Sequence, residues 1–126
     1  MSGSLLKYII VFIGAGAGGS FRYFISSLAY KFFPAIFPFG TLIVNFLGSF
    51  LLGFIIFGLS DREIINSNMK LFLGVGFCGG FTTFSTFSLE TINLLRDSQF
   101  LFAGINILAN VLLTLLGVYA AYLITR

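Results

Sequence analysis

The sequence predicts an all-α membrane protein with four transmembrane helices, the third of which is broken near its middle. Three observations lead to this fold class. The 126-residue chain is 58% hydrophobic and 9% charged, with a mean hydropathy of +1.06, which is typical of membrane proteins and not of soluble ones. Charged residues and prolines divide it into four apolar segments. The third segment carries glycine and hydroxyl side chains at its centre.

Each apolar segment is long enough to cross a bilayer as a helix, because a hydrocarbon core of about 30 Å needs roughly 20 helical residues. Pro34 and Pro38 mark the loop that separates the first segment from the second. The connections between segments are short, so we expect residues 1–126 to form a single transmembrane domain. The predicted segments cover residues 5–28, 39–59, 69–95 and 100–124.

The first segment also allows a second interpretation, as a secretory signal peptide. Lys7 would lie in its charged region, residues 8–13 in its apolar region, and residues 15–17 (Ala-Gly-Ala) at its cleavage site. However, glycines continue past this site, and Gly14 and Gly18 have the helical spacing that suits close helix packing. We therefore expect a transmembrane helix here.

The centre of the third segment is predicted to interrupt its helix. Residues 76–88 read GFCGGFTTFSTFS within an uncharged run over residues 71–89. Each glycine costs a helix about 1 kcal/mol, and a hydroxyl-rich stretch follows, so we expect the break over residues 79–83. Its freed carbonyl groups need partners. Neighbouring side chains could supply them, as composition alone favours, or the carbonyls could hold a cation, as in transporters with broken helices.

Aromatic and hydroxyl side chains follow this break in a pattern that suits an anion. Phe84 and Phe87 are spaced i, i+3 and are expected on one helix face. The positive edges of their rings could stabilise an anion in a narrow passage, although two phenylalanines in a membrane helix can also simply pack. Hydroxyl donors surround the pair, at Thr83, Ser85, Thr86 and Ser88.

The second and fourth segments carry amide side chains at membrane depth. Asn45 lies in the middle of the second segment, and Asn106, Asn110 and Thr114 form a polar stripe at i, i+4 and i+8 in the fourth. Such groups are costly in hydrocarbon and normally face protein or a polar cavity. They could hydrogen-bond neighbouring helices or form one wall of an ion path, and their spacing leaves both interpretations open.

Two charged residues lie close to membrane depth, and the remaining composition excludes several functions. Arg22 could draw anions into a vestibule or extend to the headgroups, and Glu90 could pair with a base, gate an opening or be solvated.

The chain has no His and one Cys, which excludes an imidazole base, a His metal site and an intrachain disulfide. An enzyme is therefore not expected. The net charge of +3 is scattered, unlike the basic face of a nucleic-acid-binding protein.

Positive charges are almost evenly divided between the two sides of the predicted membrane protein, and this balance normally sets orientation. The chain could insert in one weakly biased orientation, or in both, giving two opposed copies that pair. A four-helix chain is thin for a pore, which favours a dimer. One side carries Lys7, Arg62, Lys70 and Arg126, and the other carries Arg22, Lys31 and Arg96.

Three motifs together resemble the Fluc (CrcB) family of fluoride channels, and the resemblance extends over the whole chain. They read GAGGSFRY at residues 16–23, GTLIVNFLGS at residues 40–49 and GGFTTFSTFSLE at residues 79–90, the last being the most specific. The resemblance implies an antiparallel, dual-topology homodimer in the bacterial inner membrane, with two fluoride pathways. It also implies a structural Na⁺ at the dimer interface, held by the backbone carbonyls of Gly79 and Thr82.

The resemblance further implies a passive channel that exports cytoplasmic fluoride by electrodiffusion. Uncharged donors can replace the water around fluoride without trapping it. A small dual-topology drug or proton exporter is the alternative, but it should carry a carboxylate deep in its first helix, and this chain has none there. A non-transporting assembly subunit would not explain the polar residues of three segments. The implied pathway comprises Asn45, Phe84, Phe87, Thr83, Ser85, Ser88, Asn106, Asn110 and Thr114, with Arg22 and Glu90 at its vestibule.

Overall fold

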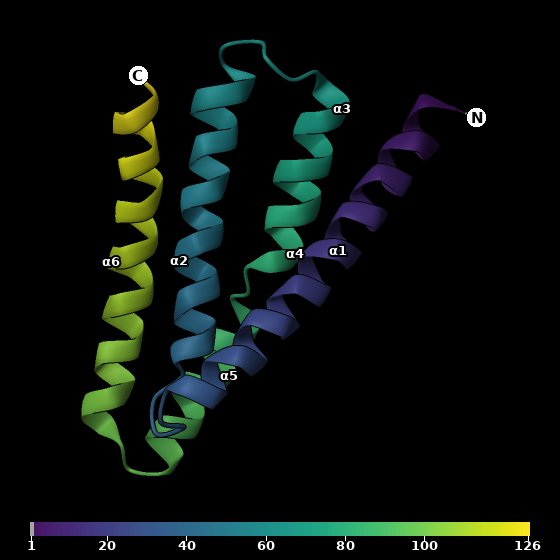
Figure 1. Ribbon diagram of the computed structural model, residues 1–126. Helices are drawn as coiled ribbons and strands as arrows, with labels where there is room; N and C mark the ends of the chain where they lie inside the picture. Colours follow the sequence, from purple (N-terminus) through teal and green to yellow (C-terminus); the bar gives the residue numbers. More distant parts are fainter. Residues whose placement is uncertain (1) are drawn as a thin grey trace.

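Four long helical stretches, long and apolar enough to cross a membrane, make up residues 2–126, the part of the chain that the computed structural model describes (Figure 1). The first is α1 (Gly3–Phe32), and the second is α2 (Phe39–Gly53) continued by the wider π-helical turns of η1 (Phe54–Ser60). The fourth is α6 (Phe100–Thr125). These stretches confirm the predicted transmembrane helices to within a few residues.

The third stretch is built from several pieces. It begins with α3 (Ser67–Lys70), continues through the π-helical η2 (Leu71–Cys78) and the single turn α4 (Gly79–Phe81), and resumes as α5 (Ser85–Arg96) after a break. The predicted interruption of the third helix is thereby confirmed.

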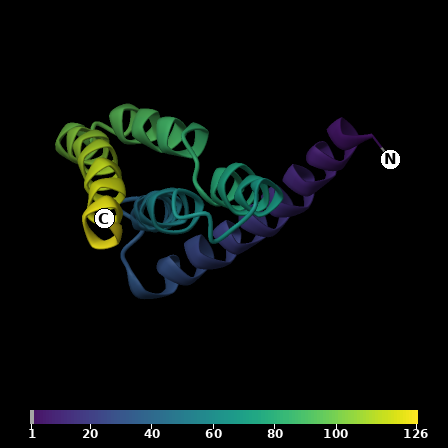
Figure 2. The ribbon, with the colours of Figure 1, turned by 90° about the horizontal axis from the view of Figure 1, so that it is seen from above.

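The helices are arranged around α2, which has α6 on one side and the first half of the third stretch on the other (Figures 1 and 2). Val44, on α2, is completely buried. The oblique helix α1 packs along η2 and α4, whereas α5 packs against α6. The break therefore lets the two halves of the third stretch take different neighbours, and it opens space beside the middle of α2.

Close contact between α1 and the third stretch depends on glycines in both. A Cβ atom added at Gly14 would lie 2.6 Å from the carbonyl oxygen of Phe72, and one added at Gly80 would collide with the backbone of Ala15. Gly18 is equally confined, by the backbone of Phe77. Only residues without a Cβ atom let the two helix backbones lie this close together, so the packing role predicted for Gly14 and Gly18 is confirmed.

The break lies three residues later than the glycines suggest. Residues 82–84 are non-helical, with Thr82 extended at φ −91° and ψ 160°, whereas Gly79 and Gly80 are still helical. The predicted span of residues 79–83 is therefore wrong at its start. Gly80 serves the contact with α1 and does not end the helix. The β-branched threonines that follow favour extended backbone, and the helix ends there.

Candidate functional site

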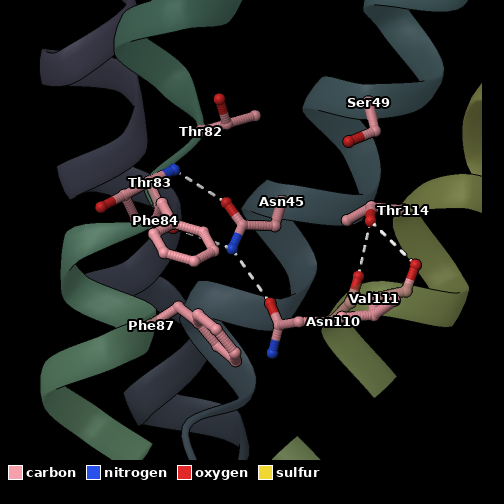
Figure 3. Close-up of a pocket in the computed structure, with 9 residues that line it drawn as sticks. All are labelled: Asn45, Ser49, Thr82, Thr83, Phe84, Phe87, Asn110, Val111 and Thr114. Carbon is pink, nitrogen blue, oxygen red and sulfur yellow. Dashed lines mark hydrogen bonds between the residues drawn. The ribbon is translucent and has the colours of Figure 1, made fainter. Parts of the chain in front are cut away.

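A cavity of about 230 Å³ lies beside the break (Figure 3). Its walls come from the middle of α2, from the non-helical residues, from the first turn of α5 and from the middle of α6. Stretches that are far apart in the sequence thus meet at one place. The lining residues are Asn45, Ser49, Thr82, Thr83, Phe84, Phe87, Asn110, Val111 and Thr114.

Asn45 holds the backbone of the break through both ends of its amide. Its Oδ1 accepts a hydrogen bond from the Thr83 N–H at 2.8 Å, and its Nδ2 donates to the Thr83 carbonyl at 3.0 Å. The same Nδ2 also donates to Oδ1 of Asn110 at 3.0 Å. Both amide hydrogens are thus engaged with protein groups, which makes Asn45 an interhelical clamp in this conformation (Figure 3).

Hydrogen-bond donors are diverted from two carbonyls at the break. In an unbroken helix the Thr83 N–H would bond to the Gly79 carbonyl, and the Thr86 N–H would bond to the Thr82 carbonyl. The first of these N–H groups donates instead to Asn45, and the second donates to the Thr83 hydroxyl at 3.1 Å. The Gly79 and Thr82 carbonyls, predicted as cation ligands, have therefore lost their helical partners.

Arg22 satisfies a third carbonyl of the break. Its Nε donates to the Gly80 carbonyl at 3.1 Å, in place of the Phe84 N–H of an unbroken helix. The side chain thereby ties α1 to the end of α4 by a charge-assisted hydrogen bond. Arg22 does not line the cavity; it contacts the third stretch from the side of α1.

The two phenylalanines lie together at the cavity but differ greatly in exposure. Their ring centroids are 5.5 Å apart, with an angle of 54° between the ring planes. Phe87 is 8% exposed, whereas Phe84, the last residue of the break, is 79% exposed. Both rings project toward the side of the break where Asn45 lies (Figure 3). A single chain therefore leaves one wall of the cavity open at Phe84.

The polar stripe of α6 is divided between the cavity and the interior. Asn110 and Thr114 line the cavity, and Thr114 donates to the Asn110 carbonyl at 2.6 Å. Asn106 does not reach the cavity, because it is completely buried and donates to the Thr91 hydroxyl at 3.0 Å. The i, i+4 spacing predicts a shared face, but it does not reveal where along that face the cavity ends.

Two predicted hydroxyls lie near the cavity without lining it. The Ser85 hydroxyl is 3.5 Å from that of Thr83, and Ser88 donates to the Phe84 carbonyl at 3.0 Å. Ser49, which was not predicted, does line the cavity. Its position one helical turn after Asn45 on an apolar helix was the signal that could have identified it.

Glu90 lies elsewhere, at a second cavity of about 400 Å³ near the loop end of α5. Tyr30, Asn93 and Asp97 share its lining, and Glu90 Oε1 is buried without a hydrogen-bond partner among residues 2–126. Within the same described range, no three His, Cys, Asp or Glu side chains come together as a metal site.

Residues 9–122 match the family described as CrcB-like protein, Camphor Resistance (CrcB). The match includes every predicted site residue. The chain belongs to the CrcB-like family. This membership, with the four apolar helices, makes it a multi-pass membrane protein, and it confirms the resemblance that the three sequence motifs carry.

Members of the CrcB-like family align with nearly the whole chain. A fluoride-specific ion channel FluC of Pyrococcus abyssi is 43% identical over 125 residues, which are 98% of both chains. The FluC of Methylocella silvestris is 38% identical over 94% of this chain and 92% of its own. The FluC of Clostridium perfringens is 47% identical over 97% of this chain and 95% of its own. These relatives are channels and not enzymes.

Proposed function

We propose that this chain is the subunit of a fluoride channel and that fluoride passes through the cavity beside the break. The observation that carries this proposal is the juxtaposition of two phenylalanine rings with amide and hydroxyl groups in a space without any full charge. Fluoride is small and strongly hydrated, so a pore must replace its water with donors. Neutral donors and positive ring edges allow the ion to enter and to leave again.

Each group of the cavity has a role in this proposal. Phe84 and Phe87 present ring edges to the anion. The Thr83 hydroxyl accepts from the Thr86 N–H, so its own hydrogen can be donated either to the Ser85 hydroxyl or into the cavity. Asn45 holds the break, and its amide offers a donor to fluoride only by exchanging one of its present partners. Thr114 and Asn110 continue the polar wall along α6, and Ser85 and Ser88 lie beside the cavity through their contacts with Thr83 and Phe84.

The exposed Phe84 supports an antiparallel homodimer as the working form. A ring that is 79% exposed leaves the cavity open on that side, and a second copy of the chain would close it. The nearly equal numbers of positive charges on the two sides of the membrane allow both orientations. We therefore infer two opposed copies, related by an axis in the membrane plane, with one pathway beside each break.

The diverted hydrogen bonds support a structural Na⁺ at the break. The carbonyls of Gly79 and Thr82 have lost their helical donors, and opposed subunits would bring two such pairs together on their shared axis. Neutral oxygens suit a monovalent ion better than a divalent ion, which usually recruits carboxylates. Glu90 is the nearest carboxylate in the sequence to Thr82, eight residues away. The ion would neutralise the carbonyl dipoles and so stabilise the interface.

Passive electrodiffusion accounts for fluoride export without an energy source. Hydrogen fluoride is a weak acid that crosses membranes in its neutral form and dissociates in the cytoplasm. A negative cell interior then drives the accumulated anion out through an open pathway in the bacterial inner membrane. A proton-coupled exporter is less well supported, because α1 has no carboxylate.

Fluoride efflux from liposomes tests the proposed function. Purified protein is reconstituted into vesicles loaded with potassium fluoride, and valinomycin provides the counter-ion path. We expect rapid fluoride release without ATP or a proton gradient, and much slower release of chloride from matched vesicles. Efflux no faster than from protein-free vesicles would overturn the proposal.

A further inference from the structure

A directional series of hydrogen bonds connects the break to the fourth membrane helix. It begins at the Thr83 N–H, which donates to Oδ1 of Asn45 at 2.8 Å. Nδ2 of Asn45 then donates to Oδ1 of Asn110 at 3.0 Å. Nδ2 of Asn110 in turn donates to Oδ1 of Asn106, also at 3.0 Å. Each amide accepts from the residue before it and donates to the next.

The same series returns from α6 to α5. Nδ2 of Asn106 donates to the Thr91 hydroxyl at 3.0 Å, and this hydroxyl donates to the Phe87 carbonyl at 2.8 Å. The two ends of the series, Thr83 and Phe87, both line the cavity beside the break. The residues between them lie on α2, α6 and α5, so the series connects the three helices that help to line the cavity. We call Asn45, Asn110, Asn106 and Thr91 the amide relay.

Every member of the amide relay is buried. The side chains of Asn45, Asn110 and Thr91 are 5–8% exposed, and that of Asn106 is completely inaccessible. A buried amide that loses a hydrogen bond without gaining another pays the cost of leaving water unpaired. Turning Asn45 or Asn110 over would set donor against donor on one side and acceptor against acceptor on the other, and turning Asn106 over would set its NH₂ group against that of Asn110. The relay thus has one favourable arrangement, and its members act together.

The position of Asn106 separates it from the anion pathway. It does not line the cavity, yet it is the only relay member that joins the amides of α2 and α6 to α5. Loss of its amide would remove one hydrogen bond from Thr91, which keeps its bond to the Phe87 carbonyl. It would also remove one from Asn110, which keeps its bonds to Asn45 and to the Asn106 backbone carbonyl. The turn of α5 that carries Phe87 would then lose this hydrogen bond to α6, and the ring could change its distance from Asn45.

We propose that Asn106 is a positioning residue, an inference that rests on the proposed function. Through Thr91 it fixes the Phe87 ring relative to the break, and it acts on fluoride passage without contacting the anion. This differs from the role as pathway wall that the polar stripe suggested. The two roles make different predictions for Thr91, which belongs to the relay but lies outside the cavity beside the break.

Three variants and a matched control test the proposal. Asn106→Leu removes the amide, and Thr91→Val removes its hydroxyl partner without a change of shape. The double variant tests whether the two act together. Thr125→Val is the control, because Thr125 is equally buried and bonds only within the last turns of α6 and to Arg62. For each variant the fluoride concentration at half-maximal liposome flux is measured on protein that elutes like the parent in size-exclusion chromatography.

We expect Asn106→Leu and Thr91→Val each to raise the half-maximal fluoride concentration at least threefold, with the double variant no worse than the more severe single variant. Thr125→Val should leave it unchanged. Parental values in folded Thr91→Val would overturn the proposal, as would effects of the two single changes that multiply in the double variant. If Asn106→Leu does not fold, Thr91→Val alone decides.

A second readout separates this proposal from the proposed function. With 4-fluorophenylalanine in place of Phe87, the ¹⁹F resonance reports the surroundings of the ring without any transport. Asn106→Leu and Thr91→Val should shift or broaden this resonance, and Thr125→Val should not. A response in protein that conducts no fluoride would retain the positioning role and reject the channel. An unchanged resonance in a conducting channel would reject the positioning role alone.

Discussion

Asn45 binds both backbone polar groups of Thr83, accepting from its N–H at 2.8 Å and donating to its carbonyl at 3.0 Å. One side chain of α2 thereby replaces the hydrogen bonds that the third helix forgoes at its break. The same contact withdraws the Thr83 N–H from the Gly79 carbonyl. The hydrogen bond from Thr83 to Asn45 thus both holds the break to α2 and frees the Gly79 carbonyl, which is proposed as a cation ligand.

Removal of this clamp should destabilise the protein. Asn45→Ala leaves both groups of Thr83 and Oδ1 of Asn110 without their partner. Each buried unpaired group costs about 1–3 kcal/mol, although hydrogen bonds between membrane helices average nearer 0.6 kcal/mol. We expect the free energy of unfolding in detergent to fall by about 2 kcal/mol. Ser49→Ala, one turn along the same helix, should retain parental stability, and equal stability of the two variants would contradict the clamp.

The aromatic pair should be required for conduction and not for assembly. Phe84→Ile or Phe87→Ile retains apolar bulk but loses the positive ring edge. Ring-edge interactions are worth about 0.5–1.5 kcal/mol, so we expect liposome fluoride flux to fall roughly fivefold or more, with the elution volume of the purified protein unchanged. Phe12→Ile, at a ring that is 80% exposed on α1, is the control. Near-parental flux in both variants would mean that the rings only pack.

Gly80 should tolerate no side chain. In Gly80→Ala the new methyl group collides with the backbone of Ala15, so α1 and α4 must separate. Overpacking of this kind costs about 1–3 kcal/mol, which a thermal unfolding scan in detergent can detect. Gly104→Ala is the matched change, because its Cβ would meet open space and alanine favours a helix by about 0.5–1 kcal/mol. Equal loss of stability in both variants would refute the close α1–α4 contact.

The sequence predicts the helices of this fold better than it predicts the break and the cavity. Apolar segments of sufficient length have few alternatives, so the four spans are correct. The break lies later than predicted because a glycine can either end a helix or make room for a neighbouring helix. Gly80 does the second, and only the packing of α1 against it reveals this. Asn106 and Asn110 share one stripe, but the position of α5 decides that only the second reaches the cavity.

The inverted dimer can be tested through the balance of positive charge. Two or three added lysines in the loops of one side should lock one orientation, because positive residues in short loops set topology. A locked variant alone should lose fluoride flux, and co-expression with an oppositely locked variant should restore it. Full flux from a single locked variant would be incompatible with opposed subunits.

Sodium removal tests the proposed cation at the break. Purification and reconstitution with a large organic cation should weaken the dimer or abolish flux, and added Na⁺ should restore both where K⁺ does not. Since the ligands would be backbone carbonyls, Thr82→Ser should keep this Na⁺ dependence. Unchanged dimer and flux after verified removal of Na⁺ would mean that the carbonyls of Gly79 and Thr82 are satisfied without an ion.

The central claim, a passive pathway for fluoride, is tested most directly by the reversal potential of the current in a planar bilayer. With a tenfold fluoride gradient, equal chloride on both sides and equal pH, a fluoride-selective channel should reverse near the fluoride equilibrium potential, about 59 mV for a monovalent ion. Changing the pH on one side should not move it. A reversal potential near zero, or one that follows the proton gradient, would contradict the account.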